Sequence, residues 1–188
     1  MILSGLDYDL FTAINGWHSV PVDHFMEFIS SRSAAIPMYV LLAVFLWNKY
    51  KMSLGWIVLA VVLLILASDQ FSVFIKFYVE RLRPCHDPLL SSSIHLVNNH
   101  CGGEFGFYSS HASNTAALAV FISHFIRNKY LWIILGIWVF LVGYSRIYLG
   151  AHFPLDILAG WTVGTLLGLG IARLTKRFIQ RKQKSVSA

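Results

Sequence analysis

Long apolar stretches separated by short polar segments dominate the sequence. Five of them approach or reach the roughly 20 residues that a helix needs to cross a bilayer, at 33–47, 54–75, 111–126, 131–148 and 154–174. The first and third are short, but helical flanks or local thinning of the bilayer would let them cross as well. The pattern predicts an all-α fold, a polytopic membrane helix bundle of about five transmembrane helices.

The first 30 residues carry a different pattern. Apolar side chains recur there at helical spacing, interleaved with acidic and amide side chains: Leu6, Asp7, Asp9, Leu10, Phe11, Ile14, Asn15 and Trp17. This alternation predicts that segment 1–30 contains an amphipathic helix lying in the membrane interface. We do not expect a cleavable signal peptide here, because a basic start and an unbroken apolar core are both missing.

The composition supports a membrane protein with a single domain. Of 188 residues, 56% are hydrophobic and only 13% are charged, which is far more apolar than an ordinary soluble domain. We find no Gly/Ser linker, low-complexity run or internal repeat that would divide the chain. Residues 1–188 are therefore predicted to form one domain.

Basic residues predict how the chain is oriented in the membrane. They gather in two short polar segments and in the tail: Lys49, Lys51, Arg127, Lys129, Arg173, Lys176, Arg177, Arg181, Lys182 and Lys184. Basic segments stay on the cytoplasmic side, so segments 77–110 and 146–153 are expected outside. The net charge of +6 is then best explained by a cytoplasmic tail, 175–188, that binds anionic lipid headgroups rather than nucleic acid.

Three polar patches that the predicted topology places on the outer face carry candidate chemistry. Residues 76–84, 108–111 and 145–156 include the long cationic side chains of Lys76, Arg83 and Arg146. Phosphate oxygens attract such groups, and arginine binds them through a two-pronged fork. Lys76 and Arg83 are seven residues apart and share a helix face if the preceding helix continues. Isolated residues at a helix end would more often extend to lipid headgroups.

The other two patches supply hydroxyl, imidazole and carboxylate groups. Ser109 and Ser110 precede a predicted helix, where we expect one serine to cap the helix and the other to face phosphate. His152 and Asp156 are four residues apart beside a proline suited to a first helical turn, so an Asp–His pair is expected. Asp156 would accept a hydrogen bond from the protonated ring nitrogen of His152 and leave the other nitrogen free to attack phosphorus.

The spacing of these residues resembles the type 2 phosphatidic acid phosphatase superfamily, whose pattern is K-x6-R-P, P-S-G-H and S-R-x5-H-x3-D. The first and third parts match fully, whereas Tyr108 and Ser110 replace the proline and glycine of the second. The similar region is about 54–174. The resemblance implies an integral-membrane lipid phosphatase without metal or cofactor. The resemblance also implies that His152 forms a phosphohistidine, and that His111 protonates the leaving group and then activates water.

The resemblance also narrows the substrate to a membrane lipid carrying a phosphate or diphosphate. Undecaprenyl diphosphate, hydrolysed at the outer face of a bacterial inner membrane, is the first expectation. Lipid A and phosphatidylglycerophosphate are the alternatives. From a different class, the protein could be a non-catalytic membrane protein that binds anionic lipids in the same basic pocket.

Further polar residues lie near the three patches. Cys85 and Cys101 would form a disulfide in an oxidising compartment and close the outer loop 77–110. The alternative is a zinc site in which the two cysteines, His86 and His100 are the ligands, although the usual C-x2-C spacing is missing. Asp69, inside a predicted span, is expected to face the protein interior, orienting Lys76 or packing with polar neighbours. Glu104 is either a group that tunes a histidine or a solvated carboxylate.

Overall fold

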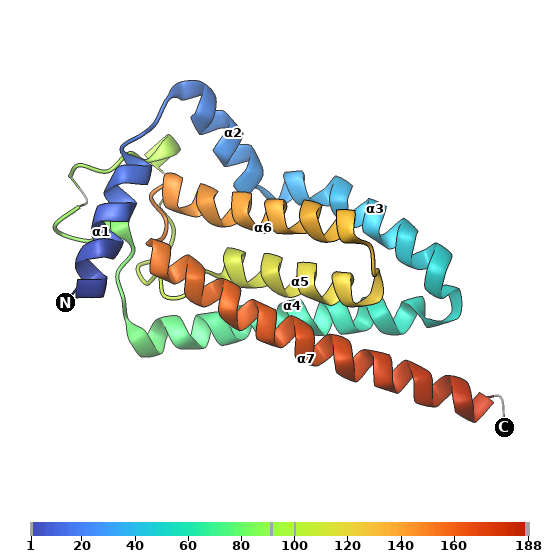
Figure 1. Ribbon diagram of the computed structural model, residues 1–188. Coiled ribbons are helices and arrows are strands. Elements are labelled where there is room, and N and C mark those ends of the chain that lie inside the picture. Colours follow the sequence, from blue (N-terminus) through green and yellow to red (C-terminus); the bar gives the residue numbers. More distant parts are fainter. Residues whose placement is uncertain (1, 91, 100, 187–188) are drawn as a thin grey trace.

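The computed structural model describes residues 2–90, 92–99 and 101–186, and helices account for most of them (Figure 1). The α-helices are α1 (Ile2–Asn15), α2 (Val20–Ser30), α3 (Arg32–Tyr50), α4 (Leu54–Val79), α5 (Ser110–Phe125), α6 (Lys129–Tyr148) and α7 (Pro154–Val186). Short 3-10 turns occupy Lys51–Ser53, Pro84–His86 and Val97–Asn99. The predicted all-α fold is confirmed.

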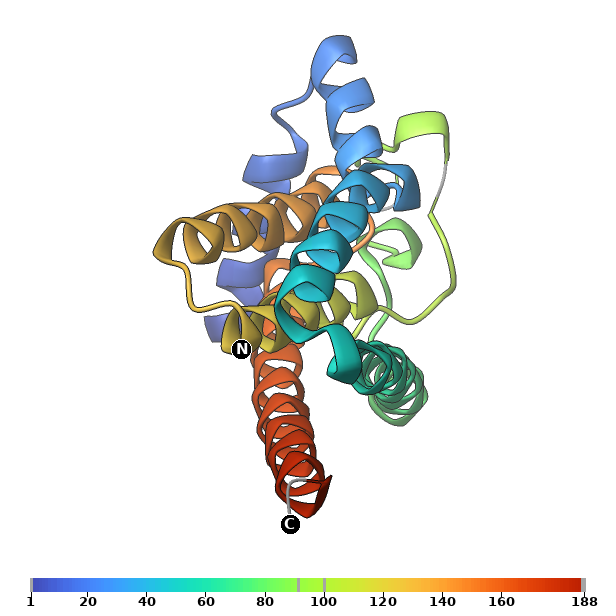
Figure 2. The same ribbon diagram turned by 90° about the vertical axis from the view of Figure 1, so that its right-hand side faces the viewer.

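Each of the five predicted spans is a helix in the structure. Within the described residues, α4, α6 and α7 are long and apolar enough to cross a membrane. Helix α5 has 16 residues, about 24 Å of length, and much of its surface is buried by the other helices. The number of spans therefore stays a prediction. Helix α7 continues through the basic tail to Val186 and extends beyond the other helices (Figure 2).

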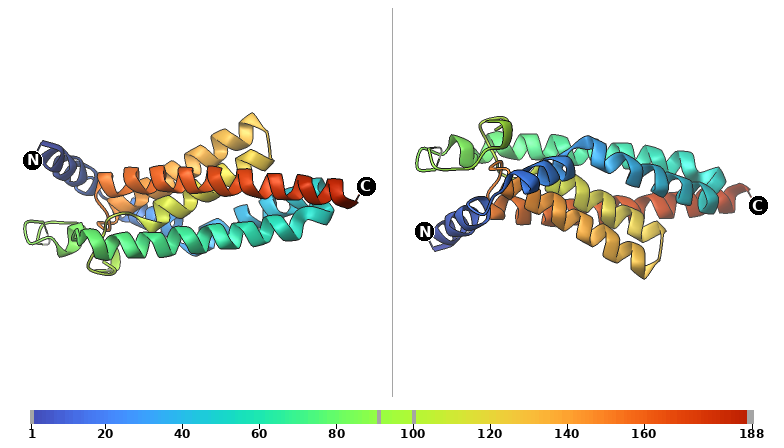
Figure 3. Two further views of the ribbon diagram at one scale, coloured as in Figure 1. Left: turned by 90° about the horizontal axis from the view of Figure 1, so that it is seen from below. Right: turned by 90° about the horizontal axis from the view of Figure 1, so that it is seen from above.

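The three motif patches gather at one end of the bundle. The end of α4, the start of α5 and the turn between α6 and α7 lie there, together with α1 and the described parts of segment 80–109 (Figures 1 and 3). We call this the motif end. The α3–α4 and α5–α6 connections and the C-terminus lie at the opposite end, which agrees with the sidedness that the basic residues predict.

Helices α5 and α7 pack closely along each other because α7 presents a row of glycines. A Cβ atom added to Gly160 would lie 2.7 Å from the Ser109 carbonyl oxygen. A Cβ added to Gly164 would approach the Ser113 carbonyl oxygen, and one added to Gly168 the Ala117 carbonyl oxygen, more closely still. Small residues at four-residue spacing let helix backbones approach in this way. The contact holds the starts of α5 and α7 together, and the Ser109 N–H donates to the Asp156 carbonyl oxygen at 3.1 Å.

The N-terminal segment differs from its prediction. Two helices, not one, occupy it, and they meet at residues 16–19. The chain turns there because Pro21 lies in the first turn of α2 and lacks the N–H that would continue a preceding helix. Asp7 and Asn15 are buried rather than on a polar face. The Asn15 side chain donates to the carbonyl oxygens of Tyr148 and His95, which ties α1 to the motif end.

Replacing Gly164 with alanine should destabilise the protein, because the new methyl group would collide with the α5 backbone. Overpacking of this kind costs about 1–3 kcal/mol, and thermal unfolding in detergent would show it as a lower Tm. Gly170→Ala is the matched control on the same helix, since its added Cβ would lie within 4 Å of no described atom beyond the helix's own nearby backbone. Equal Tm values for the two variants would contradict the proposed close contact.

Candidate active site

Arg83 reaches the site from a loop, not from a helix. Helix α4 ends at Val79, and Glu80 follows in a left-handed conformation with φ of 51°. The helix does not continue to Arg83, which was the condition for Lys76 and Arg83 to share one helix face, so the two side chains come from a helix and from a loop. Backbone hydrogen bonds hold the loop in place. The Arg83 N–H donates to the Glu104 carbonyl oxygen at 3.0 Å, and the Gly106 N–H donates to the Arg81 carbonyl oxygen at 2.8 Å.

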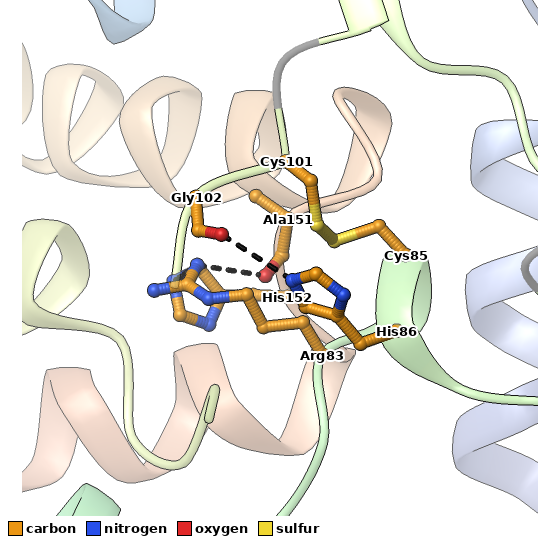
Figure 4. The surroundings of a disulfide bond; sticks show 7 residues. All are labelled: Arg83, Cys85, His86, Cys101, Gly102, Ala151 and His152. Carbon is orange, nitrogen blue, oxygen red and sulfur yellow. Dashed lines mark hydrogen bonds between the residues drawn. A yellow bond between two sulfur atoms is a disulfide. The ribbon is translucent and has the colours of Figure 1, made fainter. Parts of the chain in front are cut away.

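His152 is buried in the turn between α6 and α7, with 2% of its surface exposed. The Arg83 Nη1 lies 3.1 Å from its Nε2 and also donates to the Ala151 carbonyl oxygen at 3.1 Å (Figure 4). Burial of the imidazole, and then the nearby cations, Arg83 first, hold the His152 pKa well below its usual 6.5. A histidine in this environment is neutral at physiological pH, as a nucleophile must be.

Asp156, in the first turn of α7, faces the other nitrogen of this ring. Its Oδ2 lies 3.5 Å from His152 Nδ1 and accepts a hydrogen bond from Phe153 N–H at 3.0 Å. Its Oδ1 accepts from Arg81 Nη1 at 2.7 Å. The 3.5 Å separation is longer than a good hydrogen bond, and such contacts in unliganded sites often tighten when the substrate binds.

The two serines at the start of α5 have different partners. Ser109 is fully buried, and its hydroxyl accepts from Ala112 N–H at 3.4 Å as the helix cap. The Ser110 hydroxyl instead accepts from Lys76 Nζ at 2.6 Å and lies 2.8 Å from Ser72 Oγ. Ser110 has a helical backbone, so serine replaces the glycine of the family pattern without the strain of a positive φ.

His111 and Arg146 complete the group of cationic and imidazole side chains. Together with Arg83 and Lys76, they act electrostatically on His152. Arg146 Nη1 donates to Ser30 Oγ at 2.5 Å, and its buried Nε has no hydrogen-bond partner among the residues that the structure describes. Beside them lies a cavity of about 250 Å³, lined by Ile29, Ser30, Ser31, Tyr39, Asp69, Ser110, His111, Asn114, Thr115, Trp138 and Val142.

The structure places two further acidic residues of the sequence analysis. Asp69 lines the cavity with Ser110 and His111, while Ser68 instead pairs with Ser113, at 2.8 Å between hydroxyl oxygens. The Glu104 side chain is exposed on the outer loop, where it resembles a solvated carboxylate more than a partner of the site histidines.

Cys85 and Cys101 form a disulfide across the outer loop. It lies beside Arg83 and His152 (Figure 4), and His86 Nε2 lies 3.3 Å from the Gly102 carbonyl oxygen next to it. The two sulfur atoms are bonded to each other, so in this state neither is a thiolate ligand for the alternative zinc site. His100, the fourth candidate ligand, lies outside the described residues.

Two site residues escaped the sequence analysis. Arg81 bonds Asp156 on one side and Asp7 on the other. Arg81 lies inside the K-x6-R-P motif, and a second arginine two residues before Arg83 was a usable signal. Asp7 gave none, because a carboxylate on an amphipathic helix is ordinarily assigned to the solvated face.

This end of the bundle combines a neutral buried imidazole, a carboxylate facing one of its nitrogens, the Arg83 guanidinium at the other, and further cations nearby. That is the chemistry of a phosphatase, in which positive charge stabilises the phosphoryl oxygens and a nucleophile attacks phosphorus. Residues 54–180 match the model of the PAP2 superfamily. The chain belongs to this family of phosphatases, and it is a multi-pass membrane protein.

Comparison with individual proteins agrees with this assignment. The chain is 39% identical to the lipid A 4'-phosphatase of Porphyromonas gingivalis, covering 87% of this chain and 70% of that protein. It is 34% identical to the lipid A 4'-phosphatase of Bacteroides thetaiotaomicron, covering 86% and 73%. The crystal structure of a Bacillus subtilis transmembrane PAP2 type phosphatidylglycerolphosphate phosphatase superposes with a TM-score of 0.72 at 26% identity, covering 96% of this chain and 87% of that chain.

Acidification should destabilise the protein through His152. Because its folded pKa lies well below 6.5, the unfolded chain binds the extra proton between pH 6.5 and the folded pKa, and the free energy of unfolding falls as pH drops. One group contributes at most about 1.4 kcal/mol per pH unit. Tm measured from about pH 7 to about pH 5 should therefore fall more steeply for wild type than for His152→Asn. Parallel curves would count against a depressed pKa.

Removing the disulfide should lower stability while leaving the chemistry. The bridge joins residues 16 apart, and closing a loop of that size stabilises by about 3 kcal/mol. Cys85→Ser/Cys101→Ser should therefore unfold at a lower Tm and remain active below it. A reducing agent should lower the Tm of wild type and leave that of the double variant unchanged. Insensitivity of wild type to the reductant would argue against the bridge.

Proposed function

We propose that the protein is a lipid phosphatase that works through a phosphohistidine on His152. Nε2 attacks phosphorus, the N–P bond forms and the bond from phosphorus to the lipid oxygen breaks, while His111 gives that oxygen a proton. Water then attacks phosphorus, the N–P bond breaks and His111 takes the proton of the water. The pairing of buried His152 with Asp156 on one side and Arg83 on the other is the observation that carries this proposal.

The cationic side chains have distinct roles in the proposal. Arg83, Lys76 and Arg146 bind the phosphoryl oxygens, and Ser110 holds the Lys76 ammonium in place. The contact of Arg83 with His152 Nε2 indicates where the phosphoryl group would bind. The phosphoryl oxygens would accept the hydrogen bonds of the guanidinium in place of Nε2. Ser109 contributes by capping α5, whose first N–H groups and dipole favour an anion. The proposal needs no metal or cofactor.

An apolar cavity supports a lipid substrate. It has a volume of about 390 Å³ and lies among α3, α4 and α5, with a lining that includes Leu46, Ile57, Val61 and Leu118. Tyr39 and Asn114 line both this cavity and the one that contains His111. The two spaces therefore adjoin, and an acyl or prenyl chain in the apolar one would leave its phosphate near the site.

For the substrate, we propose the phosphate of lipid A, because two relatives with that activity in their names are 34% and 39% identical to this chain. This changes the order that the sequence analysis gave. Undecaprenyl diphosphate is the second candidate, since the undecaprenyl-diphosphatase of Bacillus subtilis is 26% identical over 87% of this chain. Phosphatidylglycerophosphate is the third, supported by a Bacillus subtilis phosphatidylglycerophosphatase that is 33% identical over 63% of this chain.

We also propose that the motif end faces the outside of a bacterial inner membrane. The basic residues of α7 lie at the opposite end from the site (Figure 3), and Lys182 lies over the Trp56 ring at 4.3 Å. Basic and aromatic side chains are typical of the interface with the cytoplasmic leaflet. The tail would then bind anionic lipid headgroups there.

Phosphate release by the purified protein, in detergent with chelator, tests the function. We expect release from lipid A, with undecaprenyl diphosphate and phosphatidylglycerophosphate assayed in parallel. His152→Ala should lower kcat by about 1,000-fold or more, and Asp156→Asn by about 100-fold or more, because one removes the nucleophile and the other its support. The control is His124→Ala, a histidine near the far end of α5, which should leave kcat unchanged.

The outcomes separate the proposals. Full activity of a folded His152→Ala would exclude His152 as the nucleophile. Release from another of the three lipids, with none from lipid A, would overturn the substrate but keep the reaction. An inactive wild type that still binds anionic lipid vesicles would favour the non-catalytic binding protein.

A further inference from the structure

Three hydrogen-bonded side chains, those of Asp7, Arg81 and Asp156, connect α1 to the active site. Arg81 Nη2 donates to Asp7 Oδ2 at 2.5 Å, and Arg81 Nη1 donates to Asp156 Oδ1 at 2.7 Å. The side chains of Asp7 and Asp156 are 1% and 0% exposed, and that of Arg81 is 24% exposed. One guanidinium therefore holds two carboxylates, one from α1 and one from α7, away from water.

The same groups also hold the backbone that carries His152. Asp7 Oδ1 accepts from Leu155 N–H at 2.8 Å, so the α1 carboxylate caps the first turn of α7. The Arg81 guanidinium lies over the Phe153 ring at 4.3 Å, and the Phe11 ring of α1 contacts that ring edge-on at 5.3 Å. Residues 153–156 are thus held on several sides by α1 and Arg81.

Arg81 and the backbone together define the orientation of the Asp156 carboxylate. Arg81 occupies Oδ1, and Phe153 N–H binds Oδ2, so the carboxylate cannot rotate without losing both hydrogen bonds. Oδ2 is thereby aimed at His152 Nδ1, 3.5 Å away. This orientation is what a carboxylate needs in order to hold a ring proton while the other nitrogen reacts.

Asp7 also matters through its charge. A guanidinium paired with Asp156 alone would cancel the charge of that carboxylate, and charges interact strongly where water is excluded. With both carboxylates ionised, Asp7 offsets the positive charge of Arg81, and the three groups together carry one net negative charge. That charge is available to stabilise the cationic imidazole that forms when His152 is phosphorylated.

We propose that Asp7 and Arg81 are positioning residues for the reaction: they orient Asp156 and preserve its negative charge toward His152. Helix α1 is then part of the catalytic apparatus and not solely an element of the membrane interface. The inference rests on the proposed function, because it assigns the two residues an effect on the His152 step.

Asp7→Asn is the direct test, because asparagine keeps an oxygen for Leu155 N–H and removes the charge. We expect kcat for lipid phosphate hydrolysis to fall about 10-fold, with KM within about twofold. Asp9→Asn is the matched control, an exposed carboxylate on the same helix, and should leave both constants unchanged. All rates are compared per folded protein, with Tm measured for each variant.

A double-variant comparison separates positioning from stability. If Asp7 acts through Asp156, then adding Asp7→Asn to Asp156→Asn should lower kcat by less than about twofold, because the group it supports is already changed. Arg81→Lys, which keeps the charge but lacks the fork that holds both carboxylates, should behave in the same way. It replaces Asp7→Asn in the comparison if that variant does not fold.

The results are decisive in either direction. An equal loss of kcat in the wild-type and Asp156→Asn backgrounds, or no loss in either, overturns the positioning role while leaving the phosphatase intact. A wild type without activity on any of the three lipids overturns the proposed function, and the inference falls with it.

Discussion

The contact between α5 and α7 determines how the whole site is assembled. Gly160, Gly164 and Gly168 leave α7 without side chains along one row, and the α5 backbone fills that space. Packing between helices in a membrane depends on such close fits, because lipid chains are as apolar as the side chains they replace. The contact brings the capped start of α5 next to the first turn of α7, so His111 and Asp156 come to the same end of the bundle.

A second constraint is the cost of burying charge. Arg83 contacts the neutral His152, and burial of the ring together with the positive charge of Arg83, Arg146 and Lys76 lowers its pKa. A phosphate group would bring negative charge to the same place, which would compensate the cations. Within the described part of the chain, the buried Arg146 Nε and Arg83 Nε have no hydrogen-bond partner, which leaves both donors available to an anionic ligand.

The acidic groups of the site show the opposite solution. Asp7 and Asp156 remain buried because Arg81 and backbone N–H groups take up their oxygens. A buried carboxylate without such partners would be costly. The arrangement uses one helix that the phosphatase motifs do not include, and this explains why the N-terminal segment packs onto the motif end.

The sequence by itself determined the five apolar helices, their approximate limits and the identity of the motif residues, but not the division of the N-terminal segment into two helices. Local sequence patterns can be recognised without a structure. They include the apolar stretches and the spacing of Lys76, Arg83, His152 and Asp156. The tertiary structure decided which atoms meet: that Arg83 reaches Nε2 from a loop, that Ser109 caps while Ser110 holds Lys76, and that Asp7 joins Arg81. These contacts depend on chain reversals and on helix packing between residues far apart in sequence. The periodicity of apolar and polar residues along the chain does not predict them.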